Sequence, residues 1–128
     1  ALSETMHHHA IFMAATDEAA GWTSQFREII LNVAAELHDL RGQGPLPELA
    51  ADDYGAAQTM GRAHYLAGGE GICYPSVRGQ GACAALFYPD LAQLPTQGRH
   101  LDYHWDGVRV DLVRDRTNGI VYRVEVTV

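Results

Sequence analysis

Hydrophobic and polar residues recur along the chain with two different periods. In residues 2–14 the apolar positions repeat every three to four residues, which predicts an amphipathic helix with Leu2 and Met6 on its apolar face. Residues 26–40 fit both periods: their isoleucine, leucine and valine positions alternate as in a strand, yet also form a helical stripe. The β-branched residues favour the strand. Between these segments, the small and polar residues 15–25 predict a loop.

Aspartate and glycine residues delimit the elements in the middle of the chain. Asp52 or Asp53 is placed to cap a second helix over residues 54–67, and two glycines follow that helix as a stop signal. The short apolar runs 71–75 and 82–88 come next, separated by a glycine-rich link. These runs predict two successive strands.

The C-terminal third alternates with a period of two and carries turn signals. Asp106-Gly107 and Asn118-Gly119 each separate two alternating runs, which predicts two β-hairpins. Residues 89–95, bounded by two prolines, predict a loop. The expected fold class is α+β, with mixed or antiparallel β-sheets and a few helices. We expect a single domain over residues 1–128 whose N-terminal part is missing from this sequence.

The net charge and the composition argue against several classes of function. The net charge of −7 argues against a broad surface for nucleic acid or for an anionic membrane. No apolar run approaches the roughly 18 residues of a membrane-spanning helix, and no signal-peptide pattern is visible. Cys73 and Cys83 lie in apolar runs without metal or redox spacing, so we expect buried free thiols and a cytoplasmic protein.

The residue types that carry chemistry give no familiar catalytic pattern by themselves. His7, His8 and His9 are consecutive, so they point in different directions from a helix, and no His-Glu-x-x-His motif accompanies them. We therefore expect no metal. Ser76 follows a short apolar run but lacks the Gly-x-Ser-x-Gly pattern of serine hydrolases. Taken alone, Ser76 is typical of a turn residue and Glu4 of a first-turn acid favoured by the helix dipole.

Three segments taken together resemble the RES domain, a family named for an arginine, a glutamate and a serine. Glu4, with His8 four residues later, resembles the helix that carries the family's glutamate. Residues 36–40 (Glu-Leu-His-Asp-Leu) are similar to a family strand that closes on an Asp-Leu pair. The most specific segment is 71–78 (Gly-Ile-Cys-Tyr-Pro-Ser-Val-Arg), which is followed by Ala-Ala-Leu-Phe at 84–87.

The resemblance covers about residues 1–90 and implies consumption of NAD. RES domains supply toxins of bacterial toxin–antitoxin pairs and are similar in fold to ADP-ribosyltransferase toxins. They cleave the nicotinamide–ribose bond of NAD, their substrate, and pass ADP-ribose to a protein, water or phosphate. The resemblance implies Glu4 and Ser76 as catalytic residues and Tyr74 and Arg78 as NAD-binding residues, with no metal.

The resemblance also implies a partner protein, and one residue of the family's motif has no counterpart in this sequence. The implied partner is a cognate helix-turn-helix antitoxin protein, in a complex where the toxin is a homodimer; a protein substrate is a further implied partner, and nucleic acid and membrane are not. The family's arginine lies in a strand before the glutamate helix, and no residue of this sequence occupies that place. The alternative is therefore a catalytically inactive module that binds a nucleotide or a partner protein. The acceptor of ADP-ribose stays open.

Overall fold

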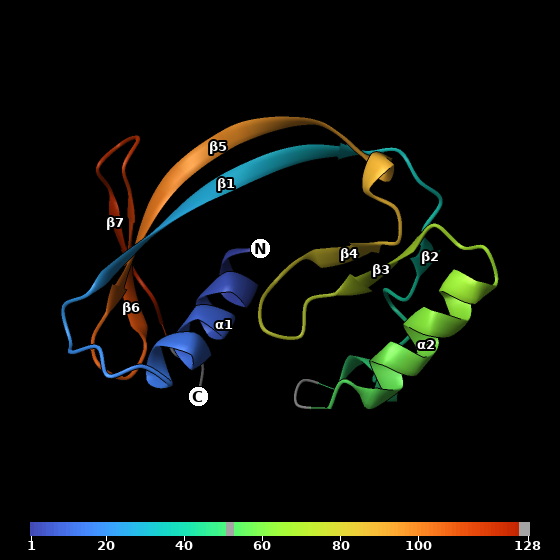
Figure 1. The fold of residues 1–128 in the computed structure, drawn as a ribbon, viewed down its shortest axis with the longest axis horizontal. Helices are drawn as coiled ribbons and strands as arrows, with labels where there is room; N and C mark the ends of the chain where they lie inside the picture. Colours follow the sequence, from blue (N-terminus) through green and yellow to red (C-terminus); the bar gives the residue numbers. More distant parts are fainter. Residues whose placement is uncertain (51–52, 126–128) are drawn as a thin grey trace. The chain divides into compact units, whose positions relative to one another are not determined.

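The computed structural model describes residues 1–50 and 53–125 and contains two compact units. The central unit is Leu31–Leu94; the outer unit combines Leu2–Ile30 with the chain from Pro95 onward. The strands β1 (Thr23–Val33) and β5 (Ala92–Trp105) each have residues in both units and are neighbours in one sheet (Figure 1). The prediction of a single domain stays a prediction.

The outer unit consists of a helix packed on an antiparallel sheet. The helix α1 (Leu2–Ala14) confirms the predicted first helix and contacts β6 (Val110–Asp115), and the sheet order is β1-β5-β6-β7 (Figure 1). One core cluster of this unit contains the buried residues Leu101, Tyr103, Val110 and Val113, with Leu2, Met6, Phe26 and Val124 packed against them. The apolar face expected from the spacing of Leu2 and Met6 is therefore the face that the helix buries.

Both predicted hairpins are present in the outer unit. At the first, the Asp106 carboxylate accepts hydrogen bonds from the amides of Val108 and Arg109, both at 2.8 Å, and Gly107 has a φ of 101° that favours glycine. At the second, Asn118 Oδ1 accepts a hydrogen bond of 2.9 Å from the amide of Ile120 before β7 (Val121–Arg123). The end of the alternating run lies outside the described residues.

The loop predicted for residues 89–95 is wrong in its second half. Pro89–Leu91 form one turn of 3-10 helix, and β5 begins at Ala92 and continues through Pro95. β6 pairs with β5 only over Leu101–Trp105. The missing N–H of Pro95 therefore removes no hydrogen bond to β6.

The central unit contains a three-stranded sheet and the helix α2 (Gly55–Leu66). The sheet order is β2 (His38–Asp39), β3 (Gly71–Pro75), β4 (Ala82–Leu86), with β2 and β3 parallel and β3 and β4 antiparallel. Strands therefore form within the ambiguous residues 26–40, although β1 ends at Val33 and the short β2 is a separate strand.

The predicted start of α2 is wrong by one position, and its predicted end is confirmed. The N-cap residue is Tyr54, which makes no side-chain capping hydrogen bond. Asp53, one residue earlier, accepts a hydrogen bond of 2.9 Å from the amide of Gly55 at Oδ1, and Asp52 lies outside the described residues. At the other end, the amides of Gly68 and Gly69 donate to the carbonyls of Tyr65 and His64, and Gly68 has a φ of 84°. This pair of bonds is a Schellman motif, which satisfies the last carbonyls of the helix.

The two cysteines are free, and both are half-buried rather than fully buried. Cys73 lies opposite Ala84 in the β3–β4 ladder, and Cys83 lies opposite Tyr74. Successive side chains alternate between the faces of a strand, so the two thiols point to opposite faces and do not pair. Among the described residues, neither helix has the length and apolar content that crossing a membrane requires.

Candidate functional site

The serine motif lies at the loop end of the β3–β4 hairpin. Tyr74 and Pro75 are the last two residues of β3 and pair with Cys83 and Ala82. Ser76 follows the strand directly, and its amide donates a hydrogen bond of 3.0 Å to the carbonyl of Gly81. This hydrogen bond joins the first and last residues of the hairpin loop. The backbone of Ser76 is therefore held by the sheet, as the position after a short apolar run predicts.

Arg78 is tied to the start of helix α2. Its Nη2 donates a hydrogen bond of 3.2 Å to the hydroxyl of Tyr54, the residue that precedes α2. Tyr54 is 51% exposed and lies 24 positions from Arg78 in the sequence. Sequence reasoning missed Tyr54, because no spacing rule connects a residue before a helix with a hairpin loop beyond it.

The structure brings two of the three motif segments together. In the parallel pairing of β2 with β3, His38 lies opposite Ile72 and Asp39 opposite Cys73. The amide of Leu40, which is 5% exposed, donates a hydrogen bond of 2.8 Å to the carbonyl of Cys73. The Glu-Leu-His-Asp-Leu segment thus borders the strand that leads to Ser76.

Asp39 is an anion at nearly all pH values. Its carboxylate accepts hydrogen bonds of 2.9 and 3.0 Å from the Arg41 side chain, and Oδ1 also accepts one of 2.9 Å from the Arg41 amide. These bonds hold the pKa of Asp39 down to about 2. The Asp39–Arg41 pair fixes the turn after β2; because both ends of the pair are exposed, its role is local.

Glu4 belongs to the outer unit, on helix α1. His8 Nε2 lies 3.8 Å from Glu4 Oε2, one helical turn away, as the i, i+4 spacing predicts. The other three predicted site residues, Tyr74, Ser76 and Arg78, belong to the central unit. The structure therefore describes each group in its own unit, and the meeting of Glu4 with Ser76 in one pocket stays a prediction.

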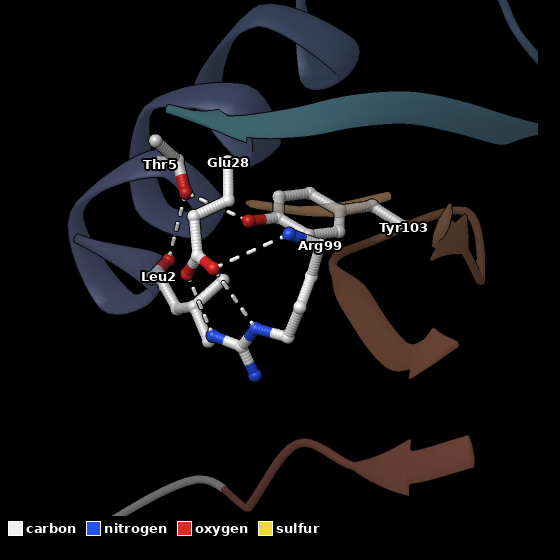
Figure 2. Close-up of polar contacts among 5 residues, drawn as sticks. All are labelled: Leu2, Thr5, Glu28, Arg99 and Tyr103. Carbon is white, nitrogen blue, oxygen red and sulfur yellow. Dashed lines mark hydrogen bonds and ion pairs between the residues drawn. The ribbon is translucent and has the colours of Figure 1, made fainter. Parts of the chain in front are cut away.

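A polar network next to Glu4 anchors the first turn of α1 to the sheet (Figure 2). Thr5 Oγ1 donates to the carbonyl of Leu2 at 3.0 Å and lies 2.8 Å from the hydroxyl of Tyr103. A hydroxyl has one proton, so Tyr103 is the donor to Thr5 in this arrangement. Burial raises the pKa of Tyr103, whose side chain is 2% exposed, and keeps it protonated.

Figure 2 also shows a separate ion pair, between β1 and β5. Arg99 Nε and Nη2 donate to the two carboxylate oxygens of Glu28 at 3.2 and 2.8 Å, and the third guanidinium nitrogen points away from Glu28 (Figure 2). Bonds from the Arg99 side chain, then from its amide, lower the pKa of Glu28. A Cβ on Gly98 would lie 2.6 Å from Glu28 Oε1, so glycine at 98 makes room for this carboxylate.

The outer unit has a pocket of about 260 Å³ against the apolar face of α1. It is lined by Leu2, Met6, Arg99, Leu101, Val113, Tyr122, Arg123, Val124 and Glu125. Glu4 lies two residues from both Leu2 and Met6, which is about 200° around a helix of 3.6 residues per turn. The Glu4 carboxylate therefore projects from the opposite side of α1, and we do not assign NAD to this pocket.

Comparisons with known proteins identify the family. A family model described as the RES domain matches residues 1–106, most of the chain. No curated protein and no solved structure matches. Within the described residues, no group of three or more histidine, cysteine or acidic side chains is arranged to hold a metal ion. The matched residues contain all three motif segments, and the chain therefore belongs to the RES domain family, which is linked to NAD-acting toxins of toxin–antitoxin pairs.

Proposed function

We propose that this chain is the toxin of a toxin–antitoxin pair and that it cleaves the nicotinamide–ribose bond of NAD, passing ADP-ribose to a protein, water or phosphate. The observation that carries the proposal is the RES-domain match over residues 1–106, which includes Glu4 and the serine motif. The same family link supports a cognate helix-turn-helix antitoxin as the partner, a homodimer within that complex, and action in the cytoplasm.

In this proposal Glu4 supplies the charge that the reaction needs. Loss of nicotinamide leaves a ribosyl oxocarbenium ion, as in glycoside cleavage. A carboxylate beside that carbon stabilises the transition state more than the ground state, because positive charge develops only as the bond breaks. At a separation near 4 Å and an effective dielectric constant near 20, the attraction is about 4 kcal/mol. That energy corresponds to roughly a thousandfold in rate.

The central-unit residues bind and orient NAD. Ser76, held by the hairpin, donates a hydrogen bond to the ribose or to the nicotinamide amide. Tyr74 stacks on a ring of the substrate, and Arg78 binds the pyrophosphate. The hydrogen bond from Arg78 to Tyr54 supports this assignment, since it restrains a guanidinium on an otherwise irregular loop. Tyr54 is thus a positioning residue for Arg78.

The test is nicotinamide release from NAD, measured with the complete protein and its Glu4→Gln variant. Gln keeps the size and the hydrogen-bonding oxygen but removes the charge, so we expect a loss of roughly a thousandfold with unchanged circular dichroism. The matched control is Glu18→Gln, in the exposed loop after α1, which should keep full activity. Full activity in folded Glu4→Gln would remove Glu4 from the mechanism.

The same experiment identifies the acceptor and tests the alternative function. Mass spectrometry of the products, with and without phosphate and cell extract, distinguishes free ADP-ribose, its phosphorylated form and a modified protein. NAD binding in calorimetry without nicotinamide release would favour the catalytically inactive binding module instead.

A further inference from the structure

A hydrogen-bonded chain of three side chains lies in the outer unit, apart from the residues proposed to act on NAD. Ser24, on β1, has its Oγ 2.8 Å from Nε2 of His9 on α1. Nε1 of Trp22, the residue just before β1, donates a hydrogen bond of 3.0 Å to the same Oγ. The Ser24 hydroxyl therefore lies between a histidine nitrogen and an indole N–H, and its proton can be transferred to the histidine.

The direction of each hydrogen bond follows from what each group can do. An indole N–H only donates, so Ser24 Oγ accepts from Trp22. Among the described residues Ser24 has no third partner, so its own proton has one acceptor within reach, Nε2 of His9. The arrangement that satisfies both hydrogen bonds at Ser24 Oγ therefore has Ser24 donating to a bare Nε2, with the histidine proton on Nδ1.

The surroundings of His9 favour this neutral ring. Phe26 meets it edge-on with ring centroids 5.0 Å apart, and Phe12 stacks on it at 6.0 Å. Tyr103, the titratable ring among its neighbours, is 6.2 Å away and is itself uncharged. Burial lowers the pKa of His9, so the ring is a free base at neutral pH. The ring is thus neutral, oriented and hydrogen-bonded to a hydroxyl.

We propose that Ser24 is a second reactive site of this chain, a hydroxyl nucleophile with His9 as its general base, which takes acyl groups from activated carboxylic esters. A nucleophile and a base within hydrogen-bonding distance are the basic unit of covalent catalysis by serine. Ser24 is partly accessible and the adjoining Trp22 is 48% exposed, so a small ester reaches the hydroxyl from solvent. This site does not depend on the proposed action on NAD.

The reaction proceeds in two balanced steps. Ser24 Oγ attacks the ester carbonyl carbon while its proton moves to His9 Nε2; the bond to the leaving oxygen breaks, and the leaving group takes that proton. Water then attacks the acyl-serine, gives its proton to His9, and releases the carboxylic acid as Ser24 regains its hydrogen. The Trp22 N–H holds the Ser24 hydroxyl in place through one lone pair of Oγ and leaves the other lone pair for the attack. Since only a base and a hydroxyl are used, the substrates are esters with good leaving groups.

The test uses the full chain with p-nitrophenyl acetate. The sequence contains no lysine, so no lysine side-chain amine competes for the acetyl group. Trypsin cuts first after Arg27, so fragmentation of peptide 1–27 locates the acetyl group. We expect it on Ser24, and we expect slower release of p-nitrophenolate in D₂O, because a proton moves in the rate-determining step.

Variants separate chemistry from structure. Ser24→Ala should reduce p-nitrophenolate release to the slow rate of the α-amine and the other nucleophiles of the chain, and His9→Gln, which keeps an acceptor but no base, should slow acetylation of Ser24 about a hundredfold. The matched control is His100→Gln: His100 also hydrogen-bonds a side chain of β1, Gln25, at 3.2 Å, and its loss should leave the rate unchanged. Circular dichroism checks each fold.

The proposal is overturned if the folded parent chain is not acetylated on Ser24. It is also overturned if His9→Gln reacts as fast as the parent. If His9→Gln does not fold, the comparison between water and D₂O on the unaltered chain decides, and an equal rate in both solvents rejects His9 as the base.

Discussion

Replacing Gly71 by alanine tests how tightly the start of the serine-motif strand is packed. A Cβ at this position would lie 2.8 Å from Cδ2 of Leu37 and closer still to the carbonyl oxygen of Ala85. Ordinary carbon–carbon contacts are about 3.5–4.0 Å. The Leu37 side chain can rotate, but the Ala85 carbonyl belongs to β4, which is paired with β3. The strand itself must therefore shift.

The cost of that shift follows from two terms. Overpacking a tight site costs about 1–3 kcal/mol, and weakening one ladder hydrogen bond adds about 1 kcal/mol. We expect Gly71→Ala to lower the free energy of unfolding by about 2–4 kcal/mol, a large part of the roughly 5–15 kcal/mol of a typical domain. The effect should reach Ser76 and Tyr74, which the same strand carries.

Gly61→Ala is the matched control, since it makes the same chemical change with the opposite expected sign. Gly61 lies inside α2, and a Cβ there meets nothing within 4 Å. Alanine is favoured over glycine in a helix interior, so the free energy of unfolding should rise by about 0.5–1 kcal/mol.

The assay is urea unfolding followed by far-ultraviolet circular dichroism and by tryptophan fluorescence. Trp22 and Trp105 both belong to the outer unit, whereas Gly71 and Gly61 belong to the central unit. With a typical slope of about 1–3 kcal/mol per molar urea, the two variants should differ in midpoint by more than about 1 M. A Gly71→Ala midpoint equal to that of the parent, or a shift of both variants in the same direction, would refute the packing argument.

Two further changes address the polar contacts. Tyr103→Phe removes the donor to Thr5 and should lower the free energy of unfolding by about 0.5–1.5 kcal/mol in the same urea assay; no loss at all would mean that this bond does not anchor α1. NMR titration of the carboxyl groups should give Asp39 a pKa of about 2, below its ordinary 3.8, and Arg41→Gln should raise it. Because the folded pKa is depressed, the pair stabilises the fold fully above pH 3.8 and loses that effect as the pH falls through about 2. An unchanged pKa in Arg41→Gln would contradict the assignment.

The parts of the fold that follow from local chemistry were predictable. The turn at Asp106-Gly107 depends on a side chain that binds amides two and three residues later and on a glycine with positive φ, and both signals lie within four positions. The Gly68-Gly69 stop works in the same way. By contrast, the extension of β5 through Pro95 depends on which strand lies beside it, which no local pattern states.

In the candidate site, too, some features follow from the local sequence and others depend on the packing of distant residues. The place of Ser76 at a strand end follows from the apolar run before it. The contact of Arg78 with Tyr54 and the pair of Arg99 with Glu28 join positions 24 and 71 apart, so only the packing of the folded chain brings them together. The sequence gives no sign that two polar residues so far apart along the chain are partners. Charged and hydroxyl side chains are common on protein surfaces whether or not they have a partner.

The connection between the two units has a consequence for protein engineering. Leu31–Leu94 is an unbroken stretch that starts on β1 and ends on β5, and the amide of Ala34 donates a hydrogen bond of 3.1 Å to the carbonyl of Leu91. The two ends of this segment therefore lie side by side, so the segment is an insertion, here called the cassette, between the neighbouring strands β1 and β5. Excising the cassette and joining β1 to β5 by a short turn would leave an ordinary hairpin in the remaining sheet. The same closeness makes the excised segment suitable for head-to-tail cyclisation.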